Sequence, residues 1–238
     1  MKIDRRIAHD VKDVEGFLSD REGMALHELA GKGAGRGSVV EIGSWKGKST
    51  IWIANNTAAG QKFYAIDPHI GSSEHQVGGP IWTFEEFKRN IKRAGVESRV
   101  TPLVLTSEEA RQKINEPLDF LFIDGAHEYE FVHQDFELWE PLLMDSCWIA
   151  FHDYQWPGVE KTLREVFATG RFRKAYFTDY LFSMQKTTQT CRRDQLRCNW
   201  MLSLGKRYCE LKASGRKDWL MKAEKNFINF LRLLVSML

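Results

Sequence analysis

Residues 38–50 read SVVEIGSWKGKST, and this stretch decides the fold of the chain. An apolar, β-branched run at 38–42 leads directly into a loop bounded by two glycines, Gly43 and Gly47. A helical pattern follows the loop from Ser49 onward. A strand, a glycine loop and a helix in this order are typical of the first unit of a parallel α/β sheet that binds a ligand at its loops.

The alternation of strand and helix patterns continues through the middle of the chain. We expect strands at residues 38–42, 62–66, 100–105, 118–123 and 147–151. We expect helices between them at residues 49–56, 83–94, 107–114, 131–142 and 159–167. Two further runs, 172–177 and 181–185, suit a β-hairpin that closes the edge of the sheet. The pattern therefore predicts a doubly wound α/β fold with a mostly parallel, seven-stranded sheet.

Composition places the chain among globular proteins. It has 238 residues, of which 43% are hydrophobic and 28% charged, so there is enough apolar material for a core. No stretch has the ~18 continuous apolar residues of a membrane span, and the first residues lack an apolar signal region. None of the four cysteines is spaced as CxxC, so we expect reduced thiols and no structural zinc. These features predict a cytoplasmic protein.

Charge divides the chain near Lys186. Residues 1–185 contain 22 lysines and arginines against 28 acidic residues, while residues 186–238 contain 12 against 4. We therefore expect an N-terminal helical cover at 1–37, the α/β domain at 38–185 and a basic helical extension at 186–238.

The last helix pattern, at residues 217–238, carries a heavy apolar load. Such a helix packs against the body of its own chain, against a second subunit in a homo-oligomer, or against a membrane surface. The pattern alone does not choose among these partners.

Polar or glycine residues follow every predicted strand of the parallel sheet. Asp67 ends the second strand and Ser107 follows the third, while Asp124 and His152 come directly after the fourth and the fifth. Because ligands of such sheets bind at the carboxyl ends of the strands, we expect these side chains to form one site.

Three ligands are compatible with glycine loops of this general kind. A P-loop needs four residues between its first glycine and the Gly-Lys-Ser element, and here there are three. A dinucleotide loop needs a second glycine where Trp45 stands. A cofactor that bears an amino acid and a ribose fits better, because Asp67 can accept both ribose hydroxyls and Glu41 can help bind an ammonium group. An ordinary turn between strand and helix stays open as the plainest alternative.

Two carboxylates at neighbouring strand ends indicate a metal site. Asp124 and Asp153 would repel one another unless a cation or a proton lay between them. A divalent cation such as magnesium would bind both and lower the pKa of a substrate hydroxyl. His127 lies three residues after Asp124, and the unperturbed pKa of histidine suits a base that works near neutral pH.

These motifs together resemble one family of enzymes. The sequence is similar to class I S-adenosylmethionine-dependent methyltransferases, and among them to the family of macrocin-type sugar O-methyltransferases and proteins labelled cephalosporin hydroxylase. The similarity covers residues 39–166. It is carried by Val39-Val40-Glu41-Ile42-Gly43-Ser44 with Gly47-Lys48-Ser49-Thr50, Ala65-Ile66-Asp67-Pro68-His69, Phe122-Ile123-Asp124-Gly125-Ala126-His127 with Tyr129, and Phe151-His152-Asp153-Tyr154 with Gly158-Val159.

The resemblance implies a Rossmann-like methyltransferase fold, with N-terminal helices over the cofactor, and S-adenosylmethionine as the cofactor. It implies a cofactor pocket formed by Glu41, Gly43, Ser44, Gly47, Ser49, Thr50, Asp67, Ser107 and Asp124.

For the chemistry, the resemblance implies that Asp124 and Asp153 bind a metal ion and that His127 is the general base, with Asp124 close to the reacting methyl group. His152 stands where relatives often carry a third acidic ligand. Imidazole suits manganese, iron or zinc better than magnesium. Either the metal differs, or only two side chains bind it, or His152 is a buried histidine without a metal.

The expected activity is metal-assisted methylation of a hydroxyl group on a sugar, a glycan or another small metabolite, with no nucleic acid as partner. Two alternatives remain: a nucleic-acid methyltransferase that uses the basic extension, and a cofactor-binding module without catalysis. A loop at 70–80, rich in glycine and serine, is a candidate lid over the acceptor or a plain connection.

Overall fold

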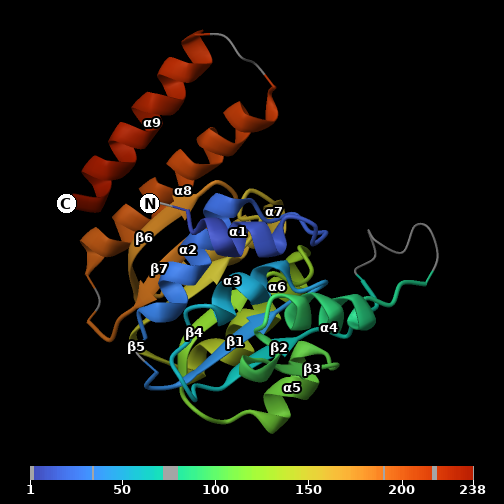
Figure 1. Ribbon diagram of the computed structural model, residues 1–238. Coiled ribbons are helices and arrows are strands. Elements are labelled where there is room, and N and C mark those ends of the chain that lie inside the picture. The colour runs from blue at the N-terminus through green and yellow to red at the C-terminus, as the bar shows by residue number, and fades with distance from the viewer. Residues whose placement is uncertain (1–2, 34, 72–79, 190, 216–218, 238) are drawn as a thin grey trace.

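The computed structural model describes residues 3–33, 35–71, 80–189, 191–215 and 219–237, and its centre is a seven-stranded sheet (Figure 1). The strand order is β3-β2-β1-β4-β5-β7-β6. The strands are β1 (Ser38–Ile42), β2 (Phe63–Ile66), β3 (Thr101–Leu103), β4 (Leu118–Ile123), β5 (Leu143–Phe151), β6 (Phe172–Thr178) and β7 (Leu181–Lys186).

Nine α-helices are described around this sheet, which confirms the predicted α/β fold class. They are α1 (Arg5–Val11), α2 (Asp20–Gly31), α3 (Lys48–Ala54), α4 (Phe84–Arg93), α5 (Ser107–Lys113), α6 (Tyr129–Trp139), α7 (Pro157–Ala168), α8 (Arg192–Ala213) and α9 (Trp219–Met237). Two 3₁₀ turns, η2 (Glu97–Arg99) and η3 (Glu140–Leu142), complete the described elements.

The sheet is parallel except at the predicted hairpin. The pairs β1·β2, β1·β4, β2·β3 and β4·β5 are parallel, whereas β7 lies antiparallel between β5 and β6. The chain leaves β1 toward β2 and later returns to the other side of β1 with β4. This reversal of strand order creates a crevice at the carboxyl ends of β1 and β4, where ligands of doubly wound sheets bind.

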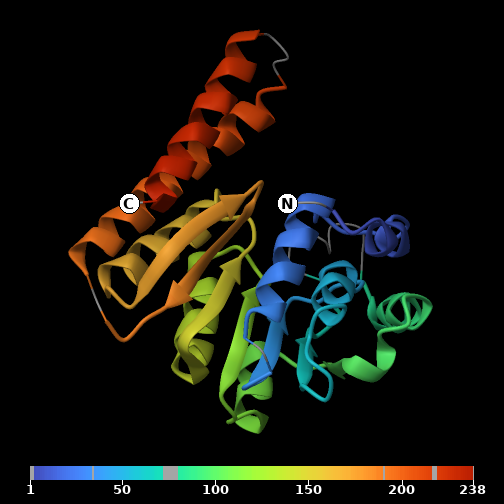
Figure 2. The ribbon, with the colours of Figure 1, turned by 60° about the vertical axis from the view of Figure 1, so that its left-hand side comes forward.

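Apolar side chains fill both faces of the sheet. Every residue of β1 and of β4 is buried, which explains their nearly continuous apolar sequences. One cluster joins one face of the sheet to α1–α4, and the other joins the opposite face to α5–α8. Figures 1 and 2 show helices on both sides of the twisted sheet.

Element boundaries differ from the sequence predictions where polar residues interrupt the pattern. β5 begins at Leu143 rather than at 147, because the exposed segment around Asp145 hides its first half from a hydrophobicity pattern. The helix expected at 131–142 ends at Trp139 and continues as η3, which has a proline in its first turn. The loop at 70–80, predicted as a possible lid, falls largely on residues 72–79, outside the described part.

The basic extension forms a helical hairpin. α8 packs against the sheet through three side chains that are buried in the core, Cys198, Met201 and Leu202. α9 returns beside α8, and Arg207 of α8 binds Glu224 of α9 with an Nη2–Oε1 distance of 2.6 Å. Figure 2 shows the C-terminal half of α8 and the N-terminal half of α9 projecting away from the sheet. Within the described residues, no helix combines the length and the apolar character needed to cross a membrane.

Candidate active site

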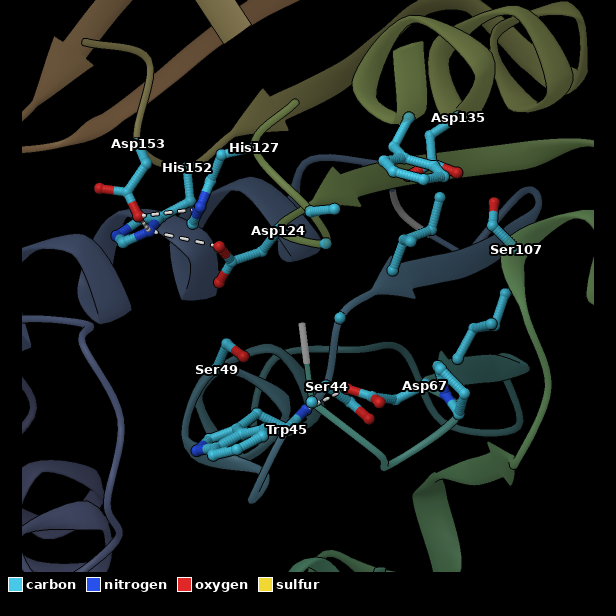
Figure 3. A pocket seen from close by; sticks show the side chains of 18 of the residues that line it. Ser44, Trp45, Ser49, Asp67, Ser107, Asp124, His127, Asp135, His152 and Asp153 are labelled. Carbon is cyan, nitrogen blue, oxygen red and sulfur yellow. Dashed lines mark hydrogen bonds and ion pairs between the residues drawn. The ribbon is translucent and has the colours of Figure 1, made fainter. Parts of the chain in front are cut away.

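A cleft of about 420 Å³ lies at the carboxyl ends of the strands. The loops after β1, β2, β3, β4 and β5 line it, together with residues 15–18 from the segment before α2. We call it the main cleft. Figure 3 shows Asp124, His127, His152 and Asp153 gathered at one end of it.

The glycine loop is packed directly against the loop that follows β4. Gly43 has a φ of 88°, and a Cβ atom at this position would lie 2.0 Å from the carbonyl oxygen of Asp124. Gly47 has a φ of 89° and precedes α3. Glycine is therefore required at 43 for two separate reasons, its backbone conformation and the close approach of another backbone.

Asp67 is held in place at the other end of the main cleft. Its Oδ2 accepts a hydrogen bond of 2.7 Å from the backbone N–H of Trp45, and its Oδ1 accepts one of 2.6 Å from the N–H of His69. The carboxylate lines the cleft although it is only 7% exposed. The remaining lone pairs of a fixed carboxylate are suited to accept hydrogen bonds from the two hydroxyls of a ribose.

Ser44 offers a second polar group to a ligand. Its side chain is 1% exposed and lines the main cleft, and its Oγ has no hydrogen-bond partner among the described residues. A buried hydroxyl without a partner is costly, so a bound polar ligand would satisfy it. Ser49 and Ser107 also line the cleft, as does Gly43.

Three predicted cofactor residues, Glu41, Gly47 and Thr50, do not line the main cleft. Glu41 is fully buried beneath the loop, and the Thr50 hydroxyl donates a 2.5 Å hydrogen bond to its Oε2. Burial raises the pKa of Glu41 to about 8, although the hydroxyls of Ser49 and Thr50 oppose the shift. In this structure, Glu41 supports the loop from below and does not offer its carboxyl group to the cleft.

The buried acid of Glu41 makes stability depend on pH. The pKa of Glu41 is near 8 in the folded chain, against 4.5 for an ordinary glutamate. Its contribution to the free energy of unfolding is therefore complete below pH 4.5 and is lost as the pH rises toward 8. We expect wild type to lose about 1.4 kcal/mol of unfolding free energy per pH unit more than Glu41→Gln between pH 5 and pH 7.5. Urea unfolding at three pH values measures the two slopes. Parallel slopes would contradict a protonated Glu41.

At the chemical end of the main cleft, two carboxylates meet one imidazole. The Nδ1 atom of His152 lies 3.3 Å from Oδ1 of Asp124 and 3.1 Å from Oδ2 of Asp153. These are the predicted metal ligands, and the three side chains can each offer an atom within 4.8 Å of the others. They come together because β4 and β5 are neighbours and the His152 N–H extends the pairing by donating to the Ile123 carbonyl.

The electrostatics of this group reflect its burial and its mixed charges. Burial opposes the charged form of His152, but the carboxylates of Asp124, Asp153 and Glu22 together raise its pKa well above the ordinary value. Burial raises the pKa of Asp124. Burial acts in the same direction on Asp153, yet its bonds to His127 and His152 outweigh it and leave the pKa of Asp153 lowered.

The donor set fits a divalent cation. The other ring nitrogen of His152, Nε2, faces the buried carboxylate of Glu22 at 3.6 Å from its Oε1. A carboxylate behind a histidine fixes the ring so that the opposite nitrogen points at a metal. A donor set of one nitrogen and two carboxylate oxygens suits manganese better than magnesium, which typically takes only oxygen ligands.

His127 lies beside this group, as predicted. Its Nε2 is 3.2 Å from Oδ2 of Asp153, and its ring stacks on Trp156 with a centroid distance of 4.9 Å. The stacking and the carboxylate hold the imidazole at the rim of the main cleft.

The sequence analysis did not identify Asp135, which the structure puts in the main cleft. Asp135 is 7% exposed, and burial raises its pKa to about 6 against the effect of a hydrogen bond with Ser107. Phe131 and Gln134 of the same helix also line the cleft. Their spacing from Asp135 places all three on one face of α6, which is a signal that the sequence did contain.

The comparisons with known proteins agree with this geometry. Residues 40–154 match the family described as methyltransferase domain. An uncharacterized protein of Acanthamoeba polyphaga mimivirus is 29% identical over 139 residues, which make up 53% of this chain and 59% of the viral protein. The chain thus spans less than two thirds of that relative.

Two solved structures have the same fold. An O-methyltransferase from Bacillus cereus in complex with SAH has a TM-score of 0.58 at 21% identity, over 77% of this chain and 91% of that chain. The O-methyltransferase TomG from Streptomyces achromogenes, involved in tomaymycin synthesis and in complex with SAM, has a TM-score of 0.56 at 17% identity, over 79% and 92% of the two chains.

The match of residues 40–154 to the methyltransferase-domain family and the shared fold of two O-methyltransferases confirm the predicted class, the class I, S-adenosylmethionine-dependent methyltransferases.

Proposed function

We propose that the chain transfers a methyl group from S-adenosylmethionine to a hydroxyl group of a neutral acceptor, such as a sugar, a glycan or another small metabolite. One observation carries the proposal. Asp124, His127, His152 and Asp153 meet at the end of the main cleft, and His127 and Asp153 also line a second cavity. A methyl donor in the main cleft and an acceptor in the second cavity can therefore both reach His127 and Asp153.

The main cleft has groups that match the parts of the cofactor. S-adenosylmethionine supplies a methyl group on a sulfonium centre, from which a good leaving group departs. Asp67 would accept hydrogen bonds from the ribose hydroxyls, and the unpartnered Ser44 Oγ would bind the amino-acid end. Asp135, next to Ser107, would accept a hydrogen bond from the adenine amino group. These residues bind and orient the cofactor toward Asp124.

Asp124, His152 and Asp153 would hold a divalent cation, with manganese preferred. When bound, such a cation lowers the pKa of an acceptor hydroxyl. His127 would take up the hydroxyl proton at Nδ1, because its Nε2 faces the carboxylate of Asp153, which would stabilise the imidazolium that forms. Trp156 keeps the ring in that orientation by stacking on it. The hydroxyl oxygen then attacks the methyl carbon as the bond from carbon to sulfur breaks.

The second cavity, of about 690 Å³, has the character of an acceptor site. Three aromatic side chains, Phe17, Trp156 and Tyr180, line it and offer faces to a ring. Lys206 and Glu210 of α8 also line it, and each is bonded within the chain, Lys206 to Glu160 and Glu210 to Arg207. Since these charges are already paired, the cavity favours an acceptor without net charge.

Calorimetric titration with S-adenosylhomocysteine tests the cofactor assignment. We expect micromolar binding in EDTA, and a separate titration with Mn²⁺ tests the metal group. The absence of any heat with S-adenosylhomocysteine, while nucleotides bind, would contradict the assignment and favour a phosphate-binding loop.

His127→Ala should abolish methyl transfer while the affinity for S-adenosylhomocysteine stays within about tenfold, because the side chain accepts a proton and does not hold the nucleoside. Release of S-adenosylhomocysteine is followed with a panel of glycosides and phenols that bear neighbouring hydroxyls. Turnover at the wild-type rate in the variant would rule out His127 as the base.

Ion pairs within the chain also bear on the alternative that the basic extension binds a nucleic-acid substrate. Lys206, Arg207 and Lys212 of the basic extension contact Glu160, Glu224 and Asp179 respectively. These three cations are therefore already paired with acidic side chains of the same chain, whereas Arg192, Arg193 and Lys222 are exposed.

A further inference from the structure

The hairpin of α8 and α9 exposes an unusual amount of apolar surface. Among the described residues, half of the large hydrophobic side chains that are exposed lie on these two helices. We call these six side chains the hairpin stripe. They are Leu196 (55% exposed), Trp200 (62%), Phe227 (57%), Phe230 (54%), Leu233 (57%) and Leu234 (42%).

The opposite side of α9 is the side that packs on the body. Ile228 is 3% exposed, and Nη1 of Arg232 donates a 2.9 Å hydrogen bond to the carbonyl oxygen of Phe177. Phe230 and Leu234 each lie two residues after one of these contacts, about 200° round the helix, so they point away from the body. The fold of the single chain therefore leaves the hairpin stripe uncovered.

The spacing of the exposed residues of α9 fits another helix. Ala223, Phe227, Phe230 and Leu234 are exposed or partly exposed and follow one another at intervals of four, three and four residues. This interval pattern forms the narrow apolar seam by which two helices pack side by side. The seam itself contains no charged residue, so two copies of it would meet without repulsion.

The positions of the charged residues distinguish between a helix and a lipid surface as the partner of α9. A helix that lies on an anionic membrane directs its lysines and arginines to the lipid headgroups beside its apolar face. In α9, Arg232 is bonded to the body and the Lys225 ammonium lies 5.7 Å from the ring centroid of Tyr208. Of the three described cations of this helix, only Lys222 is exposed. The part of the hairpin stripe on α9 thus lacks the basic border that lipid binding requires, while the exposed Arg192 and Arg193 lie on α8, near Leu196.

The exposed area is sufficient for a pair of chains. With about 150–250 Å² for a large side chain, the exposed parts of the hairpin stripe amount to roughly 600 Å² per copy. Two copies would bury on the order of 1,200 Å², which is the lower limit for a specific interface, before any polar rim is counted.

We infer that the hairpin stripe is a self-association surface, covered by the hairpin stripe of a second copy of this chain. The two hairpins would then form a four-helix arrangement about a twofold axis. This inference concerns the extension alone and does not depend on the proposed methyl transfer.

Light scattering after size exclusion tests it on the full chain. We expect wild type to have twice the mass of one chain at micromolar concentration, and Phe227→Ser/Phe230→Ser to raise the dimer dissociation constant by at least about 100-fold. Phe131→Ser is the matched control, because Phe131 is 55% exposed but lies on α6 of the body. The control should keep the wild-type mass.

Circular dichroism and binding of S-adenosylhomocysteine verify that the double variant is folded. A monomeric wild type, or a dimer that survives the double substitution, would overturn the inference. So would a monomer that sediments with vesicles of phosphatidylcholine and phosphatidylglycerol and loses this property in the double variant, since the hairpin stripe would then face lipid.

Discussion

Replacing Asp124 by asparagine is expected to lower the affinity for Mn²⁺ by at least about 100-fold, because changes that merely support a ligand already cost 10–100-fold. The substitution removes one of the two carboxylates that contact Nδ1 of His152 and leaves only Asp153 to balance a cation there. Methyl transfer should be lost as well, since the acceptor hydroxyl would no longer be activated. Affinity for S-adenosylhomocysteine should stay within about tenfold.

Asp135→Asn is the matched control for this experiment. Asp135 is also a buried carboxyl group of the main cleft with a raised pKa, but it does not belong to the group of possible metal ligands. The Asp135→Asn variant should leave Mn²⁺ binding unchanged and should weaken binding of S-adenosylhomocysteine. The two substitutions therefore act on different ligands. Equal loss of Mn²⁺ binding in both variants would show that the cation is not held where we propose.

The sequence was sufficient to predict the sheet and the meeting of Asp124, His152 and Asp153, because both depend on local pattern. Strands are recognised by short apolar runs, and each of Asp124, His152 and Asp153 directly follows such a run. Their meeting needs one further assumption, that the fourth and fifth strands are neighbours, and the pairing of β4 with β5 agrees with it. The order of the strands in a doubly wound sheet makes that assumption reasonable.

Contacts between distant segments could not be predicted in the same way. Glu22, which faces His152, belongs to a helix near the N-terminus, and nothing in its local sequence marks it as part of a site. Glu41 was expected to reach the cofactor, but an acidic residue within a strand gives no indication of whether its side chain faces a cleft or a core. The outward direction of the hairpin stripe depends equally on how α8 packs against the sheet.

Gly43→Ala is expected to be the most destabilising single substitution of the glycine loop. Two costs add at this position. A left-handed backbone costs a residue with a side chain about 1–2 kcal/mol. The new Cβ would also lie 2.0 Å from the carbonyl oxygen of Asp124, which cannot retreat easily because the Asp124 N–H is bonded to the Ile42 carbonyl at 2.8 Å.

Gly60→Ala separates the two costs, since Gly60 has a φ of 75° and its Cβ would meet nothing within 4 Å. Urea unfolding should show a loss of about 1 kcal/mol for Gly60→Ala and at least about 3 kcal/mol for Gly43→Ala. Only Gly43→Ala should also impair the binding of S-adenosylhomocysteine and Mn²⁺, because the displaced carbonyl belongs to Asp124. Equal losses in the two variants would mean that backbone conformation alone requires the glycine. In that case the loops after β1 and β4 would be less tightly joined than their contact indicates, and the cofactor loop would not fix the position of Asp124.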